Sequence, residues 1–561
     1  MDIQAPHPAH GVRTERARGT RRRAMSRAAA LLAAGTSVTL PAACAPPGPG
    51  TPASDPRAGQ PAGGAPATAA PAGQPRPGGV TVWAAETDPV ALNPITNSNF
   101  SSTQGFEHVY ESLTAYDSKL NIVPALAERW DTPDDRTYIF YLRRGVKWHD
   151  GTEFTAEDVK YTFDIVLDPS GPAVWRSNFD QVERVETLDR YTVRFSTKAP
   201  FPPLLGAFAI LRSSAIIQQG AMDKLKLETQ AIGTGPYKLL EYVPKSHLKL
   251  ARHPQYWGSP LPYIEDVTLK VLEEEDARVA ALRSGAVDYA FLTPEGELRL
   301  RNDRNLQLLS GPRVFLYVFI ANMLRQPWND VRVRQAISLA VDREEMIDKT
   351  LSGAGTVSGP IATGFGDWFV PPEELKRRWY TPDLNRARQL LREAGVPDGQ
   401  ELDLLLTPSS PFYAAAAVVF KNQLQKIGIN VKIRQVEQGV FIREASAEGG
   451  WNYDFNVNAF SPRHDPDGFL WARFYSKNPT AVGYSNEKID GLLLTARTTV
   501  DLRARRAMYD EAQRILLDEA PMLWIAVDNV IEGLQPRLKG YTQSPFTRRD
   551  WGLKHAWLST P

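Results

Sequence analysis

Two kinds of hydrophobic spacing alternate along residues 80–561, and this alternation limits the possible folds more than any other feature. Apolar residues recur at every second position in short segments such as 137–142 and 190–195, which is the spacing of a half-buried strand. In segments such as 159–167 and 387–394 they recur instead on one face of a helix. Because the two kinds of segment interleave without an internal repeat, the sequence predicts an α/β fold.

The size and charge of the chain narrow its class. A chain of 561 residues is longer than one compact core usually fills, so at least two lobes are expected. Lys and Arg number 65 against 64 Asp and Glu, which gives a net charge of +1 and argues against nucleic acid as a partner. The eight His residues are scattered and there is one Cys, so we expect no metal site, cofactor or internal disulfide.

The N-terminal residues have the composition of an export signal. Arginines crowd residues 13–27, and small and apolar residues follow to position 43, which predicts a signal peptide over residues 1–44. Residues 45–79 are dominated by Pro, Gly and Ala and predict a disordered linker, so folded structure is expected to begin near Val80. No apolar run is long enough to span a bilayer.

Two processing routes remain open at Cys44. The stretch Leu40–Cys44 resembles a lipoprotein box, in which case lipid on the cysteine would tether the protein to a membrane. Alternatively, Ala43–Ala45 is a small-residue cleavage site, and its use would remove the cysteine. Residues 20–25 also resemble a twin-arginine signal, so export by the general secretory or the twin-arginine route is open. Whichever processing and export route is used, the sequence predicts a periplasmic or extracellular location.

One long stretch resembles a known family. Residues 126–130, 137–151 and 155–159 closely resemble the signature of the family 5 solute-binding proteins, the dipeptide- and oligopeptide-binding family of ABC importers. Further motifs of that family follow in the same order along the chain: Gly233–Tyr237, Tyr256–Gly258, Ala277–Asp288, Tyr380–Gly395 and Asp465–Asp467. The resemblance covers essentially everything from Val80 to the C-terminus.

The resemblance implies an architecture of two lobes joined by a hinge. A first lobe would comprise residues 80–120, 228–313 and 527–561, with an extra subdomain inserted at 121–227. Residues 314–526 would form the second lobe. Ligand would bind in the cleft between the lobes, which close over it because ligand contacts stabilise the closed state.

The resemblance also implies a function. The chain would capture a peptide or peptide-like solute and deliver it to the permease of an ABC importer, as a monomer that touches the membrane only through a lipid anchor. A non-peptide solute such as an opine, an oligosaccharide or a metal chelate is the alternative ligand. A secreted enzyme is a weaker alternative, because the sequence has no G-x-S-x-G, no H-E-x-x-H and no phosphate-binding glycine loop.

One position of the expected ligand site departs from the family. Peptide-binding members carry an aspartate shortly before the Asp-Pro-Asp motif, and it pairs with the amino terminus of the peptide. Here Pro462 stands at that position, so the charge is missing. Arg463 and His464 offer instead a cation and a titratable donor for an anionic or hydroxyl-rich ligand. The alternative is that Arg463 pairs with Asp465 or Asp467 on the surface.

The remaining candidates for ligand binding are aromatic or polar. We expect Tyr317, Trp368 and Phe460 to form an aromatic wall, with burial in the core as the alternative. Polar contacts are expected from Asn99, Thr103 and Asp465. His149 and Asp150 lie in the signature motif and are expected to be structural turn residues and not catalytic groups.

Overall fold

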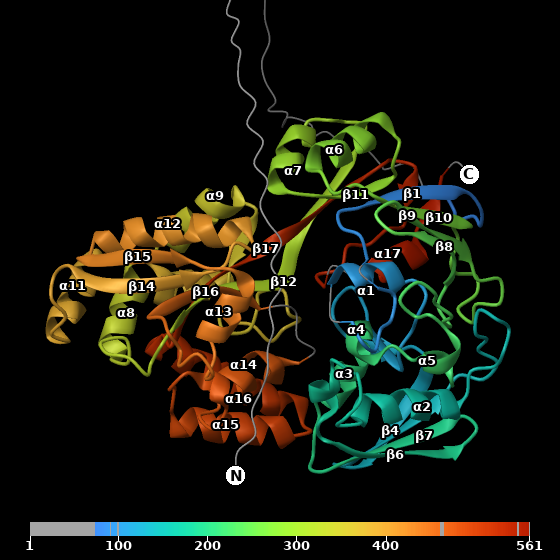
Figure 1. Ribbon diagram of the computed structural model, residues 1–561, viewed down its shortest axis with the longest axis horizontal. Coiled ribbons are helices and arrows are strands. Elements are labelled where there is room, and N and C mark those ends of the chain that lie inside the picture. Colours follow the sequence, from blue (N-terminus) through green and yellow to red (C-terminus); the bar gives the residue numbers. More distant parts are fainter. Residues whose placement is uncertain (1–72, 90, 98–99, 461–464, 547–548, 560–561) are drawn as a thin grey trace, which may run out of the picture. The chain divides into compact units, whose positions relative to one another are not determined.

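The computed structural model describes residues 73–559, except 90, 98–99, 461–464 and 547–548 (Figure 1). The described residues fall within one compact unit, Pro71–Pro561. Its first regular element, strand β1 (Val80–Ala85), begins at the position that the sequence predicted. The predicted signal peptide, Cys44 and most of the predicted linker lie outside the described residues. In the part of the chain that is described, no helix is long and apolar enough to cross a membrane.

An eleven-stranded mixed sheet runs through the folded part of the chain. Strand β1 is parallel to β10 and β11, and most of the other neighbours are antiparallel. The predicted α/β fold is therefore confirmed. The strands in spatial order are β15 (Ile429–Gln435), β14 (Gln400–Leu406), β16 (Phe455–Phe460), β12 (Gln307–Ala321), β17 (Met522–Leu534), β11 (Tyr289–Leu292), β1, β10 (Asp266–Val271), β9 (His247–Arg252) and β8 (Tyr237–Val243), with β13 (Gly355–Val357) paired to β17.

Two long strands at the centre of this sheet connect its two halves. Strands β12 and β17 pair antiparallel from Gln307 and Leu534 at one end to Ile320 and Met522 at the other, with an irregularity after Pro312 (Figure 1). The first end adjoins β11 and the second adjoins β16. The expected lobe boundaries, 313/314 and 526/527, both fall inside these strands, and as boundaries they stay a prediction.

Two large hydrophobic cores lie within the described residues. One core gathers mostly side chains of the second lobe, such as Phe319 and Trp524, and it also includes Tyr116 of the first lobe. The other is shared by the first lobe and the inserted subdomain, and it includes Trp83 and Phe140. The helices of the second lobe are α8 (Val331–Ala340), α9 (Arg343–Leu351), α10 (Pro372–Leu375), α11 (Leu384–Glu393), α12 (Pro411–Gln425), α13 (Gln438–Glu444), α14 (Pro466–Phe474), α15 (Glu487–Thr498) and α16 (Leu502–Glu519).

The inserted subdomain has a sheet of its own. Its four antiparallel strands are, in spatial order, β4 (Ala127–Asp134), β5 (Thr137–Leu142), β7 (Thr192–Thr197) and β6 (Val182–Asp189). Burial alternates along β5, as its sequence spacing predicted. Helix α2 (Ala156–Leu167) begins with the predicted capping box, in which the Asp158 carboxylate accepts a hydrogen bond from the Thr155 backbone N–H at 2.8 Å.

Shorter elements complete the first lobe and the inserted subdomain. They are α1 (Phe100–Phe106), β2 (Thr114–Tyr116), β3 (Ile122–Pro124), α3 (Leu204–Ala209), α4 (Leu211–Ser214), α5 (Ala221–Lys224), α6 (Glu275–Ser284), α7 (Pro294–Leu300), β18 (Leu538–Lys539), α17 (Arg549–His555) and β19 (Trp557–Leu558).

Two motifs recognised in the sequence meet at one carboxylate. Glu111 accepts hydrogen bonds from the Tyr256 hydroxyl at 2.7 Å, the Trp257 indole N–H at 2.8 Å and the Thr234 hydroxyl at 3.1 Å. Burial raises the pKa of Glu111, and the charge of Lys554 and these three donors oppose the rise. No local pattern singles out Glu111, because its partners are separated from it by more than a hundred residues.

His149 joins the same group of motifs. Its Nδ1 accepts a hydrogen bond from the Gly233 backbone N–H at 3.2 Å, so Nε2 carries the proton and donates to the Gly235 carbonyl at 3.0 Å. A Cβ added to Gly233 would lie 1.8 Å from the Val109 carbonyl oxygen, so this close approach of two backbones requires glycine. These contacts give His149 the structural role that was expected. We call Glu111, His149, Gly233–Gly235 and Tyr256–Trp257 the motif network.

Candidate functional site

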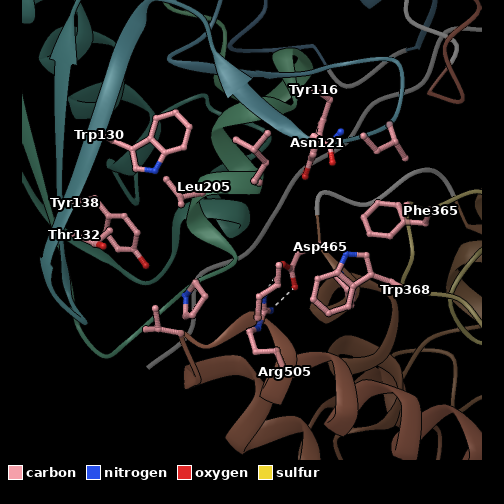
Figure 2. A pocket seen from close by; sticks show the side chains of 18 of the residues that line it. Tyr116, Asn121, Trp130, Thr132, Tyr138, Leu205, Phe365, Trp368, Asp465 and Arg505 are labelled. Atoms are coloured by element: carbon pink, nitrogen blue, oxygen red, sulfur yellow. Dashed lines mark hydrogen bonds and ion pairs between the residues drawn. The ribbon is translucent and has the colours of Figure 1, made fainter.

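A cavity of about 410 Å³ opens between the inserted subdomain and the second lobe (Figure 2). Its volume lies within the range of about 300 to 1,000 Å³ that is typical of small-molecule sites. The second-lobe wall comes from residues 365–368, from the start of α14 and from the residues around the start of α16. The lining residues of the opposite wall are Tyr116, Leu120, Asn121, Ile122, Trp130, Thr132, Asp134, Asp135, Tyr138, Pro202, Leu205 and Gly206.

Aromatic rings form much of both walls. Trp130 on β4 and Tyr138 on β5 lie on the side of the inserted subdomain, while Phe365 and Trp368 lie across from them (Figure 2). Trp130 and Trp368 are half-buried, so part of each ring faces the cavity. Because flat rings bury much apolar area at little cost in side-chain entropy, these walls suit an apolar or planar group of a ligand.

An ion pair closes the second-lobe wall. The guanidinium of Arg505 donates to both carboxylate oxygens of Asp465, at 2.7 and 3.1 Å, and the side chains are only 4% and 10% exposed. Asp465 also begins α14, since its carboxylate accepts from the Asp467 backbone N–H at 2.9 Å. Burial alone would lower the pKa of Arg505, but the charge of Asp465 raises it above its usual value. The pair joins α14 to α16.

Asp467 lies behind this pair, in a more strongly desolvated position. Burial raises its pKa to about 7, although the charge of Arg497, 3.7 Å away, opposes the rise. The Arg497 guanidinium also lies over the ring of Trp471, at 4.4 Å, and over that of Phe201 in the inserted subdomain, at 5.1 Å. Arg497 thus contacts both the inserted subdomain and the second lobe.

The rim of the cavity is acidic on one side and apolar on the other. Asp134 and Asp135 stand exposed in the turn between β4 and β5. Val500 and Leu502, at the approach to α16, are 57% and 62% exposed although both are apolar. The cavity can therefore offer aromatic contact inside and carboxylates at its mouth.

Two of the residues predicted to bind ligand line this cavity. Trp368 and Asp465 lie close together on the second-lobe wall (Figure 2). Asn99, Arg463 and His464 lie outside the described residues, as does Pro462. Their expected contacts stay predictions.

The other three predicted residues are described at positions away from the cavity lining. The Tyr317 ring stacks on that of Phe412 at a centroid distance of 3.8 Å, and its hydroxyl donates to Asp528 at 3.4 Å. Phe460 is buried beneath the guanidinium of Arg473, and Thr103 is buried in α1. The positions of Tyr317 and Phe460 agree with the alternative that these aromatic residues serve the core, and the expected ligand contact of Thr103 stays a prediction.

Several lining residues were not among those predicted to bind ligand. Trp130 and Tyr138 lay within the recognised signature and were assigned to the fold. Tyr116, Asp134 and Arg505 lay outside the motifs, and no spacing in the sequence set them apart. Only the folded chain brings these segments together. Among the described residues, no group of three or more His, Cys, Asp or Glu side chains could hold a metal ion.

Comparison with known proteins places this geometry in context. Residues 121–481 match the family model described as bacterial extracellular solute-binding proteins, family 5 middle. The glutathione-binding protein GsiB of Salmonella choleraesuis (strain SC-B67) is 28% identical over 473 residues, which cover 81% of this chain and 90% of that protein.

Solved structures share the fold. The oligopeptide-binding protein AppA of Bacillus subtilis, in complex with a nonapeptide, is 25% identical with a TM-score of 0.69, covering 87% of this chain and 100% of that one. The periplasmic binding protein DppA of Helicobacter pylori, in complex with the peptide STSA, is 25% identical with a TM-score of 0.71, covering 86% and 99%. HbpA2 of Haemophilus parasuis gives a TM-score of 0.76 at 25% identity, covering 86% and 100%.

Proposed function

This chain belongs to the bacterial extracellular solute-binding proteins of family 5, and we propose that it captures a peptide-like solute in the cavity of Figure 2 for delivery to the permease of an ABC importer. Proteins of this family are periplasmic or extracellular and bind a small molecule or peptide. The observation that carries the proposal is the cavity itself, because its two walls come from the inserted subdomain and from the second lobe.

The walls of the cavity support closure around a ligand. Strands β12 and β17 run from one half of the large sheet to the other, so a change in their twist near Pro312 would move one wall relative to the other. A ligand that contacts Trp130 on one side and Trp368 on the other would stabilise the closed arrangement, since it gains both contacts only there.

The named relatives support a peptide-like ligand and binding without turnover. GsiB is named for glutathione, and AppA and DppA are solved with peptides. We propose in addition that the chain works as a monomer and that lipid on Cys44 anchors it. The lipoprotein-like stretch Leu40–Cys44 and the Pro, Gly and Ala residues that follow it support the anchor.

Binding measurements on the purified protein test the proposal. A pool of short peptides is mixed with the protein, and native mass spectrometry identifies what stays bound. Calorimetry then gives the affinity of the best peptide for the protein and for a Trp130→Ala, Trp368→Ala double variant. We expect the double variant to bind at least about tenfold more weakly, because both rings of the wall are lost. A Tyr161→Ala variant, which changes a ring outside the cavity, serves as the control.

Each outcome decides for or against the proposal. An intact peptide in the complex, with affinity lost only in the double variant, supports it. A peptide that is cleaved or otherwise altered would favour an enzyme. Equal affinity in all three proteins would place the binding site elsewhere, and absence of any bound peptide would favour a non-peptide solute.

A further inference from the structure

The charges that line the cavity point to a narrower class of ligand. We propose that the cavity takes an apolar or aromatic side chain of a neutral or positively charged peptide, and that it disfavours peptides with an excess of carboxylates. This inference rests on the proposed function and specifies the ligand of that same site.

Arg505 is the only Lys or Arg among the described lining residues, and its charge is already paired with that of Asp465. Both of its terminal nitrogens donate to Asp465, and its Nε donates to the Ala496 carbonyl at 2.9 Å. One terminal nitrogen also reaches the Tyr509 hydroxyl, at 3.4 Å. A carboxylate of the ligand would therefore enter the cavity without a cationic partner on the described walls, and an unpaired, desolvated charge is costly.

The carboxylates at the rim also disfavour an anionic ligand. Asp134 and Asp135 are both exposed, and among the described residues neither of them forms an ion pair. Asp134 accepts hydrogen bonds from the Arg136 backbone N–H, at 2.8 Å, and from Thr137, and these contacts lower its pKa, so that its carboxylate is ionised at neutral pH. Since Asp465 is balanced by Arg505, these two carboxylates leave the described lining with net negative charge. That potential attracts a cation and repels an anion at the mouth of the cavity.

The rings of the walls favour the same ligands. The faces of Trp130 and Trp368 can contact an apolar side chain, and an indole face also attracts an ammonium or guanidinium group. Val500 and Leu502 extend the apolar surface to the rim, and a ligand that covers them gains from the removal of their area from water. An apolar or aromatic side chain with a neutral or cationic neighbour meets all of these features.

This ligand class separates the chain from its named relative. Glutathione carries one more carboxylate than ammonium groups at neutral pH, so the charge of the described lining predicts weak binding of glutathione. The opposite arrangement is an anionic ligand held by Arg463 or His464, which lie outside the described residues. The two arrangements predict opposite orders of affinity.

Calorimetry with three matched tripeptides tests the inference. Ala-Phe-Lys, Ala-Phe-Gln and Ala-Phe-Glu have the same number of residues and the same aromatic residue. Their last side chain is cationic, neutral or anionic. At low ionic strength we expect the Glu peptide to bind at least about tenfold more weakly than the Lys peptide, with the Gln peptide between them. Glutathione should bind about as weakly as the Glu peptide.

Variants of the rim identify the source of this preference. An Asp134→Asn, Asp135→Asn double variant should reduce the Lys-over-Glu ratio to about threefold or less, while the Gln peptide keeps its affinity within about twofold. An Asp223→Asn, Glu228→Gln double variant removes two exposed carboxylates away from the cavity and should leave the ratio unchanged. Thermal unfolding checks that each variant keeps the stability of the parent, as expected for exposed positions.

The outcomes for this inference and for the proposed function differ. If the Glu peptide or glutathione binds as tightly as the Lys peptide, the inference is overturned while peptide binding stands. An unchanged ratio in the Asp134, Asp135 variant also overturns it, because the charge preference then comes from elsewhere. If none of the peptides binds, the proposed function fails and the inference fails with it.

Discussion

The motif network and the cavity contain similar residues in different environments. In the motif network these side chains are paired within the protein, whereas in the cavity they are partly open to solvent. In the motif network the Glu111 carboxylate accepts three side-chain hydrogen bonds, and both ring nitrogens of His149 are paired with backbone groups. In the cavity the carboxylates of Asp134 and Asp135 are exposed, and the rings of Trp130 and Trp368 are only half-buried.

This difference separates residues that specify the fold from residues that are available to a ligand. Polar groups of the motif network have their partners inside the chain, so a ligand has little to gain from them. Polar and aromatic groups of the cavity still contact water, and a ligand can replace that water. The family signature therefore identifies the architecture, whereas the proposed specificity depends on lining residues that lie mostly outside the signature.

The largest expected effect comes from the tightest contact of the motif network. In a Gly233→Ala variant the new Cβ would meet the Val109 carbonyl, so two backbone segments must move apart. We expect a loss of roughly 4 kcal/mol or more in the free energy of unfolding, measured by urea denaturation.

Gly491→Ala is the matched control. It lies in α15 with open space around its Cβ position, and it should stabilise the protein by about 0.5 to 1 kcal/mol. Equal effects of the two changes would contradict the structural role of the motif network.

A smaller effect is expected when the ion pair between Asp465 and Arg505 in the cavity wall is broken. Arg505→Met leaves the Asp465 carboxylate buried without its partner and should cost about 3 kcal/mol in the free energy of unfolding. Lys160→Met, which breaks the exposed pair between Lys160 and Asp164 on α2, should cost less than about 0.5 kcal/mol. Denaturation curves of the two variants give the comparison. A cost for Arg505→Met no larger than that for Lys160→Met would mean that the pair does not hold the wall.

The smallest expected effect is on the pH dependence of stability. Its sign differs between His253, which lies beside the motif network, and Asp467, which lies behind the cavity wall. Burial lowers the pKa of His253, whose ring lies against that of His149, to about 4. Between about pH 6.5 and pH 4 the unfolded chain then binds more protons at this residue, so its contribution to stability falls as the pH falls. Asp467 has the opposite sign. Its pKa is raised to about 7, the folded state binds more protons between pH 3.8 and 7, and its contribution is lost as the pH rises through that window.

Two variants measure these opposite slopes. His253→Phe should reduce the acid-induced loss of stability between pH 7 and pH 5 by about 1 to 2 kcal/mol. Asp467→Asn should make that loss larger, since it removes the group that favours the folded state in acid. Urea denaturation at several pH values provides the measurement. A common sign for both variants would contradict the assignment of one of the two pKa shifts.

Much of the fold could be predicted from the sequence because local spacing reflects burial. The alternation along 137–142 and the capping box at Thr155 and Asp158 each depend on neighbouring residues, and both are confirmed. Strand β1 begins at Val80, directly after the stretch rich in Pro, Gly and Ala, a composition that cannot bury enough apolar area to fold.

The site could be predicted only in part, because its walls are assembled from distant segments. Trp368 and Asp465 line the cavity, and their contact with a ligand stays a prediction. An aromatic residue in a strand gives the same local pattern whether it faces a ligand or the core. Tyr317 and Phe460 show this ambiguity, since both are buried in the core of the second lobe. Arg505 follows a helix start that is typical of any surface helix, and only its contact with Asp465, forty residues away, gives it a place in the wall.

Hydrogen exchange of the protein with and without its best peptide tests whether both walls of the cavity contact one ligand. We expect a bound peptide to protect backbone amides on both walls together, in residues 116–138 on one side and in residues 365–368 and 500–505 on the other, while the peptide is recovered intact. Protection confined to one wall, protection only at segments away from the cavity, or recovery of an altered peptide would contradict it.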